Sequence, residues 1–461
     1  DRSRELERSD PLMRRGLSVL EKNVLQSGVG FNLQNKALNP DGKPDFLANQ
    51  KIESAWWEWS RKKNCTENGE ESLYEVCRLV IRSAARDGGV LVRKIVDPES
   101  NRFGFTLRMI EIDHLDTQYN EVRSNGNRVV MGVEKNGKGK TVAYWMLKKH
   151  PGDLLFGASP YNRDRVDASE FIHYFLKERI TQCVGVPWFA PSMLRMHHLA
   201  EYELAELVAT RAEANKGGYF TSERGESYTG ENEQATAADG TTQDTGATLA
   251  ESQPGQYDEL PPGMTFVPYD PTHPTSQHGD YVNSVKLGIA AGMDISYATL
   301  VGDLTRSSFS SMRTGWLDER ETYKKMQAHM IEHLMLEIFE AWLEQSIMNG
   351  AVKLPMAKFD AFNKPVFMGR KWPWVDPQKD ITAQLMAVGG NIKTLEQVIE
   401  ESDSALDIEE TFTQRGYEAE LAKKHGIKAM IPAGMIDPDA QQSNQEGEEG
   451  EGESESEKMR L

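Results

Sequence analysis

Cysteine is scarce in this chain, which has three cysteines in 461 residues. Cys65, Cys77 and Cys183 are an odd number, and none of them belongs to a CxxC pair. This spacing argues against a disulfide framework and against a thiolate metal site, and favours reduced cysteines that pack as small apolar side chains. We therefore expect no bound metal and no cofactor.

Long apolar runs and an excess of positive charge are also missing. No apolar run approaches the ~20 residues that cross a bilayer, so we expect no membrane partner. Lys and Arg number 53 against 71 Asp and Glu, which gives a net charge of -18. A protein that coats nucleic acid through charge is basic, so this balance argues against nonspecific adhesion and against a monomeric nucleic-acid adaptor.

Motifs for catalysis are near-misses. No GxSxG motif occurs, and the run Gly139-Lys140-Thr141 ends like a phosphate-binding loop but has Glu134 where the first glycine belongs. We interpret that run as a hairpin turn. His329, Glu332 and His333 do match the HxxEH zinc-protease pattern. We expect the polar face of an amphipathic helix there and no enzyme activity, and we keep a zinc-dependent hydrolase that uses these three residues as the alternative.

One further cluster has metal-binding chemistry. In residues 110–116 His114 lies among three carboxylates along what is expected to be a strand edge. Such a group could bind a metal, but no second cluster supports it. Salt bridges at a subunit boundary are the more ordinary use of these side chains.

The periodicity of apolar residues predicts an α+β fold. From residue 89 to 175 the period is two, with Asn-Gly and Asp-Pro turns, which is typical of a mostly antiparallel β-domain. Before it we expect a strand over residues 29–33, and core packing for Trp56, Trp57 and Trp59. Helical spacing predicts helices over residues 2–25, 46–59, 73–85, about 190–215, 279–293 and 311–345, with shorter ones reaching 424.

A short polar hinge separates two of these helical patterns. In residues 304–311 five of the eight side chains carry a hydroxyl group, Arg306 supplies one cation and Phe309 one ring. Ser307 or Ser308 could cap the helix that follows. A plain capped turn and a loop that contacts nucleic acid explain this composition equally well.

Two segments have almost no aliphatic residues. Residues 222–262 are rich in Gly, Thr, Ser, Gln and Glu, which predicts a flexible surface insertion. Residues 441–461 are a Glu, Gly and Ser repeat, which predicts a disordered acidic tail.

The order of several short motifs resembles the portal proteins of lambda-type tailed phages. Each motif is weak alone, but their order and spacing cover most of residues 1–425. The motifs are the helix and strand of residues 2–34, Ala84-Ala85-Arg86-Asp87-Gly88-Gly89, Ile110-Glu111-Ile112-Asp113-His114-Leu115, Gly185-Val186-Pro187-Trp188, Phe309-Ser310-Ser311-Met312-Arg313 and Trp372-Pro373-Trp374-Val375-Asp376-Pro377.

This resemblance implies a structural protein of the virion. It implies a ring of about twelve copies at one capsid vertex, assembled in the host cytoplasm, through which double-stranded DNA is packaged and ejected without sequence readout. The implied partners are the terminase large subunit, the major capsid protein and the head-completion (adaptor) proteins, with ATP hydrolysis supplied by the terminase.

The resemblance also implies a division of the chain into wing, stem, clip and crown. The implied regions are the wing at 1–190, a stem helix at 191–215, the clip at 216–270 with the insertion 222–262, a second stem helix at 271–299, a tunnel loop at 300–310, the long helix and wing return at 311–374, the crown at 375–440 and the acidic tail at 441–461.

The implied DNA-facing residues lie in the tunnel loop. They are Thr305, Arg306, Ser307, Ser308, Phe309 and Ser310. Arg211, Lys216 and Lys286, on or near the stem, are secondary candidates. An acidic subunit repeated around a bore repels the phosphate backbone, so that DNA slides, and one arginine per subunit gives weak guidance.

Overall fold

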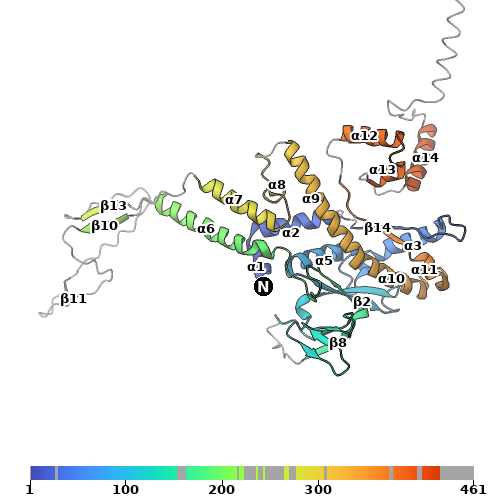
Figure 1. Ribbon diagram of the computed structural model, residues 1–461, viewed down its shortest axis with the longest axis horizontal. Coiled ribbons are helices and arrows are strands. Elements are labelled where there is room, and N and C mark those ends of the chain that lie inside the picture. Colours follow the sequence, from blue (N-terminus) through green and yellow to red (C-terminus); the bar gives the residue numbers. More distant parts are fainter. Residues whose placement is uncertain are drawn as a thin grey trace, which may run out of the picture. The chain divides into compact units, whose positions relative to one another are not determined.

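A computed structural model gives the fold of the chain (Figure 1). It divides into two compact units, Asp1–Arg370 and Lys371–Leu461. The fold is α+β, as predicted, with long helices and antiparallel sheets. The structure describes residues 2–25, 28, 30–152, 162–214, 218–222, 235–236, 242–243, 264–268, 277–305, 309–372, 377–401 and 408–425.

The N-terminal helix is interrupted, which the periodicity did not predict. Residues 2–25 form α1 (Arg2–Ser9) and α2 (Pro11–Val24). The Asp10 carboxylate accepts hydrogen bonds from the backbone N–H groups of Leu12 and Met13 at 2.7 and 2.9 Å. Asp10 therefore caps a new helix, with proline in the first position, where its missing N–H costs nothing.

Three helices and one strand follow before the β-domain. The strand lies slightly later than predicted, and it pairs antiparallel with a strand from much later in the chain. A capping box at Ser72 and Glu75 starts the last of these helices, and Gly88 ends it with φ 92°. The elements are β1 (Asn32–Asn35), α3 (Phe46–Trp59), α4 (Lys62–Cys65) and α5 (Leu73–Asp87).

An aromatic cluster forms the centre of the first unit. Trp56 and Trp59 of α3 are 1% and 0% exposed, so their predicted core role is confirmed. Both rings lie within 5.0 to 6.0 Å of the Trp342 ring, and the Trp59 indole N–H donates to the Phe105 carbonyl at 3.0 Å. Trp57 is 43% exposed, because the next residue on a helix points about 100° away, so the core prediction for it is wrong.

The β-domain is antiparallel throughout its described strands, as predicted. One sheet has the strand order β3-β2-β9 and the other β4-β5-β6-β7-β8. Asn136 and Lys140 close the turn between β6 and β7, which confirms the hairpin interpretation of Gly139-Lys140-Thr141. The elements are β2 (Val90–Val96), β3 (Phe105–Glu111), η1 (Ile112–His114), β4 (Glu121–Val122), β5 (Arg128–Val130), β6 (Val133–Lys135), β7 (Thr141–Leu147), β8 (Arg163–Asp167), η3 (Ala168–Glu170) and β9 (Phe171–Tyr174).

Two helices form an antiparallel pair after the β-domain. These are α6 (Ala190–Ala214) and α7 (His278–Gly292), close to the predicted ranges (Figure 1). Ser192 is fully buried and donates to the Ile289 carbonyl at 2.8 Å, and a Cβ atom on Gly292 would lie 2.3 Å from the Ser192 hydroxyl oxygen. Small residues therefore bring the two backbones close together at this end of the pair.

Short strands lie between these two helices in sequence. β10 (Gly218–Ser222) pairs antiparallel with β13 (Met264–Pro268), and β11 (Ala235–Thr236) pairs with β12 (Thr242–Gln243). The rest of the predicted insertion at 222–262 lies outside the described residues, and so does the tail at 441–461.

The predicted long helix is present and contains one wider turn. α9 (Phe309–Met330) continues through the π-helical turn η4 (Ile331–Met335) into α10 (Leu336–Met348). The remaining elements of the first unit are α8 (Tyr297–Val301), η5 (Met356–Lys358), α11 (Phe359–Phe362) and β14 (Pro365–Met368). The second unit contains α12 (Pro377–Gly389), α13 (Leu395–Glu401) and α14 (Ile408–Lys424).

Ion pairs attach α1 to the rest of the first unit. The one buried residue of α1 is Ser3, so the helix has no apolar face in the core. Glu7 pairs with Arg82 and, at 2.9 Å, with Arg86 of α5. Burial would raise the pKa of Glu7, but the hydrogen bonds from Arg86 and Arg82 outweigh it and hold this pKa below its ordinary value.

Replacing Glu7 tests this attachment. We expect Glu7→Gln to lower the free energy of unfolding by about 1–3 kcal/mol and to speed amide exchange in α1, because two guanidinium groups lose a charged acceptor. The control is Glu5→Gln, an exposed carboxylate on the same helix. Equal effects of the two substitutions on α1 exchange would contradict the account.

The pH dependence of wild-type α1 follows from the same pair. Because the folded-state pKa of Glu7 is depressed, its contribution is fully present above the ordinary pKa of 4.5 and is lost as the pH falls from there through the lowered folded-state pKa. The amide protection factors in α1, which are corrected for the intrinsic pH dependence of exchange, should therefore fall over that range before those in the core of α5.

Candidate nucleic-acid interface

The predicted tunnel loop lies between α8 and α9. Residues 300 and 301 belong to α8, so the non-helical part begins later than the predicted boundary. Ser296 caps α8 at its start, and Gly302, with φ 81°, ends it in the left-handed conformation that glycine favours. The described loop is therefore residues 302–305, and α9 begins at Phe309.

The structure describes only some of the candidate residues of this loop. Thr305 is exposed, and its backbone N–H and hydroxyl donate to Asp303 Oδ1 at 2.9 and 2.6 Å. Arg306, Ser307 and Ser308 lie outside the described residues. Phe309 and Ser310 form the first turn of α9, and their side chains are likewise outside the described part.

The base of the loop is fixed by buried hydrogen bonds. Thr299 of α8 donates to Glu319 of α9 at 2.8 Å, and Glu319 is 7% exposed. The Tyr323 hydroxyl donates to the same carboxylate. Burial and this hydrogen bond raise the pKa of Tyr323, so the hydroxyl stays protonated. The two helices that flank the loop are thus joined, while Leu304 in the loop is 52% exposed.

The secondary DNA-facing candidates differ in how exposed their side chains are and in whether they are paired. Arg211 is exposed in the last turn of α6. Lys286 of α7 lies against α6, where its ammonium is 3.6 Å from a Glu203 carboxylate oxygen and its side chain is 25% exposed. Lys286 therefore contributes first to the pairing of the two helices. Lys216 lies outside the described residues.

The zinc alternative has no support from the geometry. His329 and His333 lie with ring centroids 4.3 Å apart across the π-helical turn, but Glu332 is exposed. Burial, and then the neighbouring His333, lower the pKa of His329 to about 4, so the ring is neutral at pH 7. In the part of the chain that the structure describes, the one convergent set of three metal-ligating side chains is elsewhere, at Glu111, Asp113 and His150.

That second cluster is engaged in ion pairs. Arg4 of α1 pairs with Asp113 and lies 3.6 Å from Glu111, and His150 Nε2 is 3.1 Å from Glu111. The His150 Nδ1 atom accepts a hydrogen bond from the Gly152 backbone at 3.0 Å. The contact of His150 Nε2 with Glu111 lacks hydrogen-bond geometry, so it is the Arg4 guanidinium that engages the two carboxylates of this cluster. The carboxylates around His114 thus form salt bridges within one subunit.

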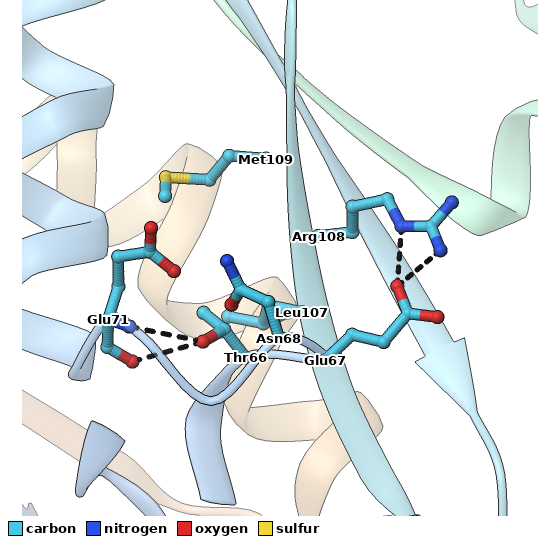
Figure 2. A pocket seen from close by; sticks show the side chains of 7 residues that line it. All are labelled: Thr66, Glu67, Asn68, Glu71, Leu107, Arg108 and Met109. Atoms are coloured by element: carbon cyan, nitrogen blue, oxygen red, sulfur yellow. Dashed lines mark hydrogen bonds and ion pairs between the residues drawn. The ribbon is translucent and has the colours of Figure 1, made fainter. Parts of the chain in front are cut away.

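A pocket beside strand β3 has no catalytic arrangement either. Its volume is about 390 Å³, and it lies between β3 and the loop before α5 (Figure 2). Glu67 pairs with Arg108, and the Thr66 hydroxyl bonds the backbone of Glu71 (Figure 2). The polar groups satisfy one another, and the lining contains no Ser, Cys or Lys nucleophile beside a base.

Two of the motifs noted in the sequence meet in space. A Cβ atom on Gly185 would lie 1.8 Å from the Gly88 carbonyl oxygen, and one on Gly88 would lie 2.8 Å from the Gly185 carbonyl carbon and oxygen. The Trp188 backbone N–H donates to the Ala85 carbonyl at 3.0 Å. These backbone contacts determine where α6 begins relative to α5, and only glycine at both positions allows them.

Comparison with known proteins identifies the class. A sequence profile described as "Phage portal protein, lambda family" matches residues 1–327. A "Probable portal protein" of Halomonas phage phiHAP-1 is 35% identical over 382 residues, which cover 83% of this chain and 72% of the relative. The chain belongs to the lambda family of phage portal proteins, a family of structural proteins, and it is a portal protein.

Solved structures of gene transfer agent particles are similar at lower identity. The "Neck of empty GTA particle computed with C6 symmetry" has 12% identity and a TM-score of 0.47, over 86% of this chain and 92% of that one. The "Virion of native gene transfer agent (GTA) particle" has 12% identity and a TM-score of 0.47, over 87% and 94%. None of the described helices is both long and apolar enough to cross a membrane.

Substituting Gly185 tests the junction at the base of α6. We expect Gly185→Ala to lower the free energy of unfolding by about 1–3 kcal/mol, because a methyl group there overlaps the Gly88 backbone, which cannot rotate away. Chemical denaturation measures this. Gly137→Ala is the control, since its Cβ atom would meet nothing within 4 Å. A neutral effect of Gly185→Ala would contradict the close contact.

Proposed function

We propose that copies of this chain assemble head to tail into a closed ring of about twelve, which forms a conduit for packaging and ejecting double-stranded DNA at one capsid vertex. Membership of the portal family supports this proposal. The structural observation that carries it is the α6–α7 pair, whose two helices each expose large apolar side chains away from their shared contact.

The outward face of α6 is uncovered in a single copy. Leu204 and Val208 are 60% and 55% exposed and, at about 100° per residue, lie on the side away from the residues that face α7. The opposite side supplies Ser192, Met196 and Leu199, which are at most 5% exposed. A helix with apolar residues on both sides is typical of one packed between two neighbours.

The outward face of α7 differs in composition from that of α6. It exposes Leu287, at 57%, whereas the half-exposed Tyr281 packs edge-on against Tyr202 of α6, with ring centroids 5.0 Å apart. Because the two faces belong to different helices, contact between copies joins unlike surfaces. Such a contact is heterologous, and it closes into a ring when the rotation between neighbours permits. Side-by-side α6–α7 pairs would then form the wall of the ring.

The charge balance suits passage of DNA in place of tight binding. With a net charge of -18 per copy, a ring repels phosphate over most of its surface. We propose that the loop between α8 and α9 lines the bore, with Thr305, Arg306, Ser307, Ser308, Phe309 and Ser310 nearest the DNA. Arg306 then supplies one cation per copy, and it contacts phosphate without reading bases.

We propose protein partners for the clip and the wing from where these regions lie along the chain. α6 has 25 residues and extends nearly 40 Å at about 1.5 Å per residue. The β10–β13 pair follows its far end in sequence. We propose that the clip at 216–270 docks the terminase large subunit and later the head-completion proteins, and that the wing contacts the major capsid protein. In this proposal the chain has no turnover of its own and assembles in the host cytoplasm before it enters the virion.

Placing a charge on the α6 face tests the ring. Leu204→Glu should reduce the ring fraction about tenfold or more at fixed protein concentration, because a carboxylate would be buried at every interface. Native mass spectrometry measures the fraction. Val122→Glu is the control, an exposed apolar residue at 70% in the β-domain. Undiminished rings of Leu204→Glu, with an unchanged circular dichroism spectrum, would show that α6 does not form the interface.

Removing the loop cation tests its role in DNA passage. Arg306→Ala should leave ring mass unchanged and change the amount of DNA packaged or retained per particle by a few-fold, since one phosphate contact per copy is lost. DNA content of assembled particles is the measurement, and Lys353→Ala, an exposed cation elsewhere in the chain, is the control. If Arg306→Ala rings failed to form, the loop would be structural; if DNA content were unaltered, the loop would not guide DNA.

A further inference from the structure

The described part of the second unit has no buried core. Of its residues whose burial the structure describes, 371–372, 378–399, 408 and 411–425, none is buried. Every buried apolar side chain found in the described part of the protein belongs to the first unit. Within the second unit Val398, Ile399, Ile408 and Ala422 are only half-buried. Its helices therefore contact one another without enclosing any side chain.

Large apolar side chains are exposed on its two longer helices. On α12, Ile381, Leu385 and Met386 are 43%, 54% and 72% exposed. Ile381, Leu385 and half-buried Val388 recur at i, i+4 and i+7, so they form one stripe along the helix. On α14, Phe412, Tyr417 and Leu421 are 54%, 65% and 36% exposed, and the last two lie one turn apart.

Helices with such stripes need a partner. Helices of 13 and 17 residues are marginal in water without packing of an apolar face, and small units with no core are not independently stable. The stripes are on different helices, so a second copy can cover both of them at once by placing its α14 on α12. The arrangement repeats from copy to copy, as in any heterologous ring.

We infer that α12 of one copy packs through Ile381 and Leu385 against Tyr417 and Leu421 on α14 of the neighbouring copy, so that this layer acquires a core only in the assembled ring. This inference rests on the proposed ring, which brings copies of the unit to high effective concentration. It concerns residues 371–425, which lie beyond residues 1–327, the range that the family profile matches.

The experiment uses disulfide trapping in the full-length protein. Leu385→Cys and Tyr417→Cys are combined in a Cys183→Ser background, because Cys65 and Cys77 are buried and Cys183 is the one native thiol with solvent access. Rings are oxidised and run on non-reducing denaturing gels. We expect a ladder of covalent multimers that extends to the whole ring, because each copy is linked to both neighbours.

Matched variants distinguish the outcomes. Each single cysteine variant should give no species above a dimer, and a second pair at Leu204→Cys and Leu287→Cys reports the contact between α6 and α7 of neighbouring copies. A ladder from the α6–α7 pair without one from the α12–α14 pair would overturn this inference and leave the proposed function intact. A disulfide confined to one chain would also overturn it. Absence of rings by native mass would overturn both.

An exchange measurement checks the same contact without cysteines. Amide exchange in α12 and α14 should slow about tenfold or more when full-length wild-type monomers assemble into rings. Leu385→Glu rings should lose that protection, whereas Glu418→Gln rings, changed at an exposed polar residue of α14, should keep it. Equal exchange in monomers and rings would contradict the inference.

Discussion

The backbone of Gly88 lies directly against the backbone of Gly185, and this contact sets where α6 leaves the rest of the first unit. Gly88 ends α5, a helix that buries its apolar face in the core. Gly185 comes three residues before Trp188, whose backbone N–H donates to the Ala85 carbonyl. The position of α6 therefore depends on two glycines that no other residue could replace without moving a backbone. If α6–α7 pairs form the wall of a ring, an error at this junction is repeated in every copy.

Between this junction and the proposed bore, the helices are joined to one another by hydrogen bonds and ion pairs, and the loop between α8 and α9 is exposed. α7 is held on α6 by the Ser192 hydrogen bond and by the Lys286–Glu203 pair, and α8 is joined to α9 through Thr299 and Glu319. The loop itself has Leu304 and Thr305 exposed between these fixed helices. A fixed base with an exposed tip can present side chains to a passing duplex without loosening the wall.

Local patterns in the sequence predicted the elements well, and contacts between distant residues were not predictable. Residues 46–59 form a helix over the predicted range, because apolar spacing reports which face is buried. The break at Asp10 was missed although an aspartate before a proline is a strong capping signal, because the apolar spacing continues across it. The π-helical turn, the exposure of Trp57 and the contact of Gly88 with Gly185 depend on tertiary packing, which periodicity does not encode. The DNA-facing role of residues 305–310 stays a prediction, and the pairing of Lys286 with Glu203 of the neighbouring helix is a contact that the sequence did not indicate.

Imaging of the purified full-length chain with double-stranded DNA tests the central claim most directly. The account predicts closed rings with a central opening, with α6 and α7 of neighbouring copies in contact around it, the α8–α9 loop nearest the axis, and DNA density that contacts the loop without a fixed base register. A stable monomer under assembly conditions, an open filament, or rings whose opening is lined by the β-domain would contradict it.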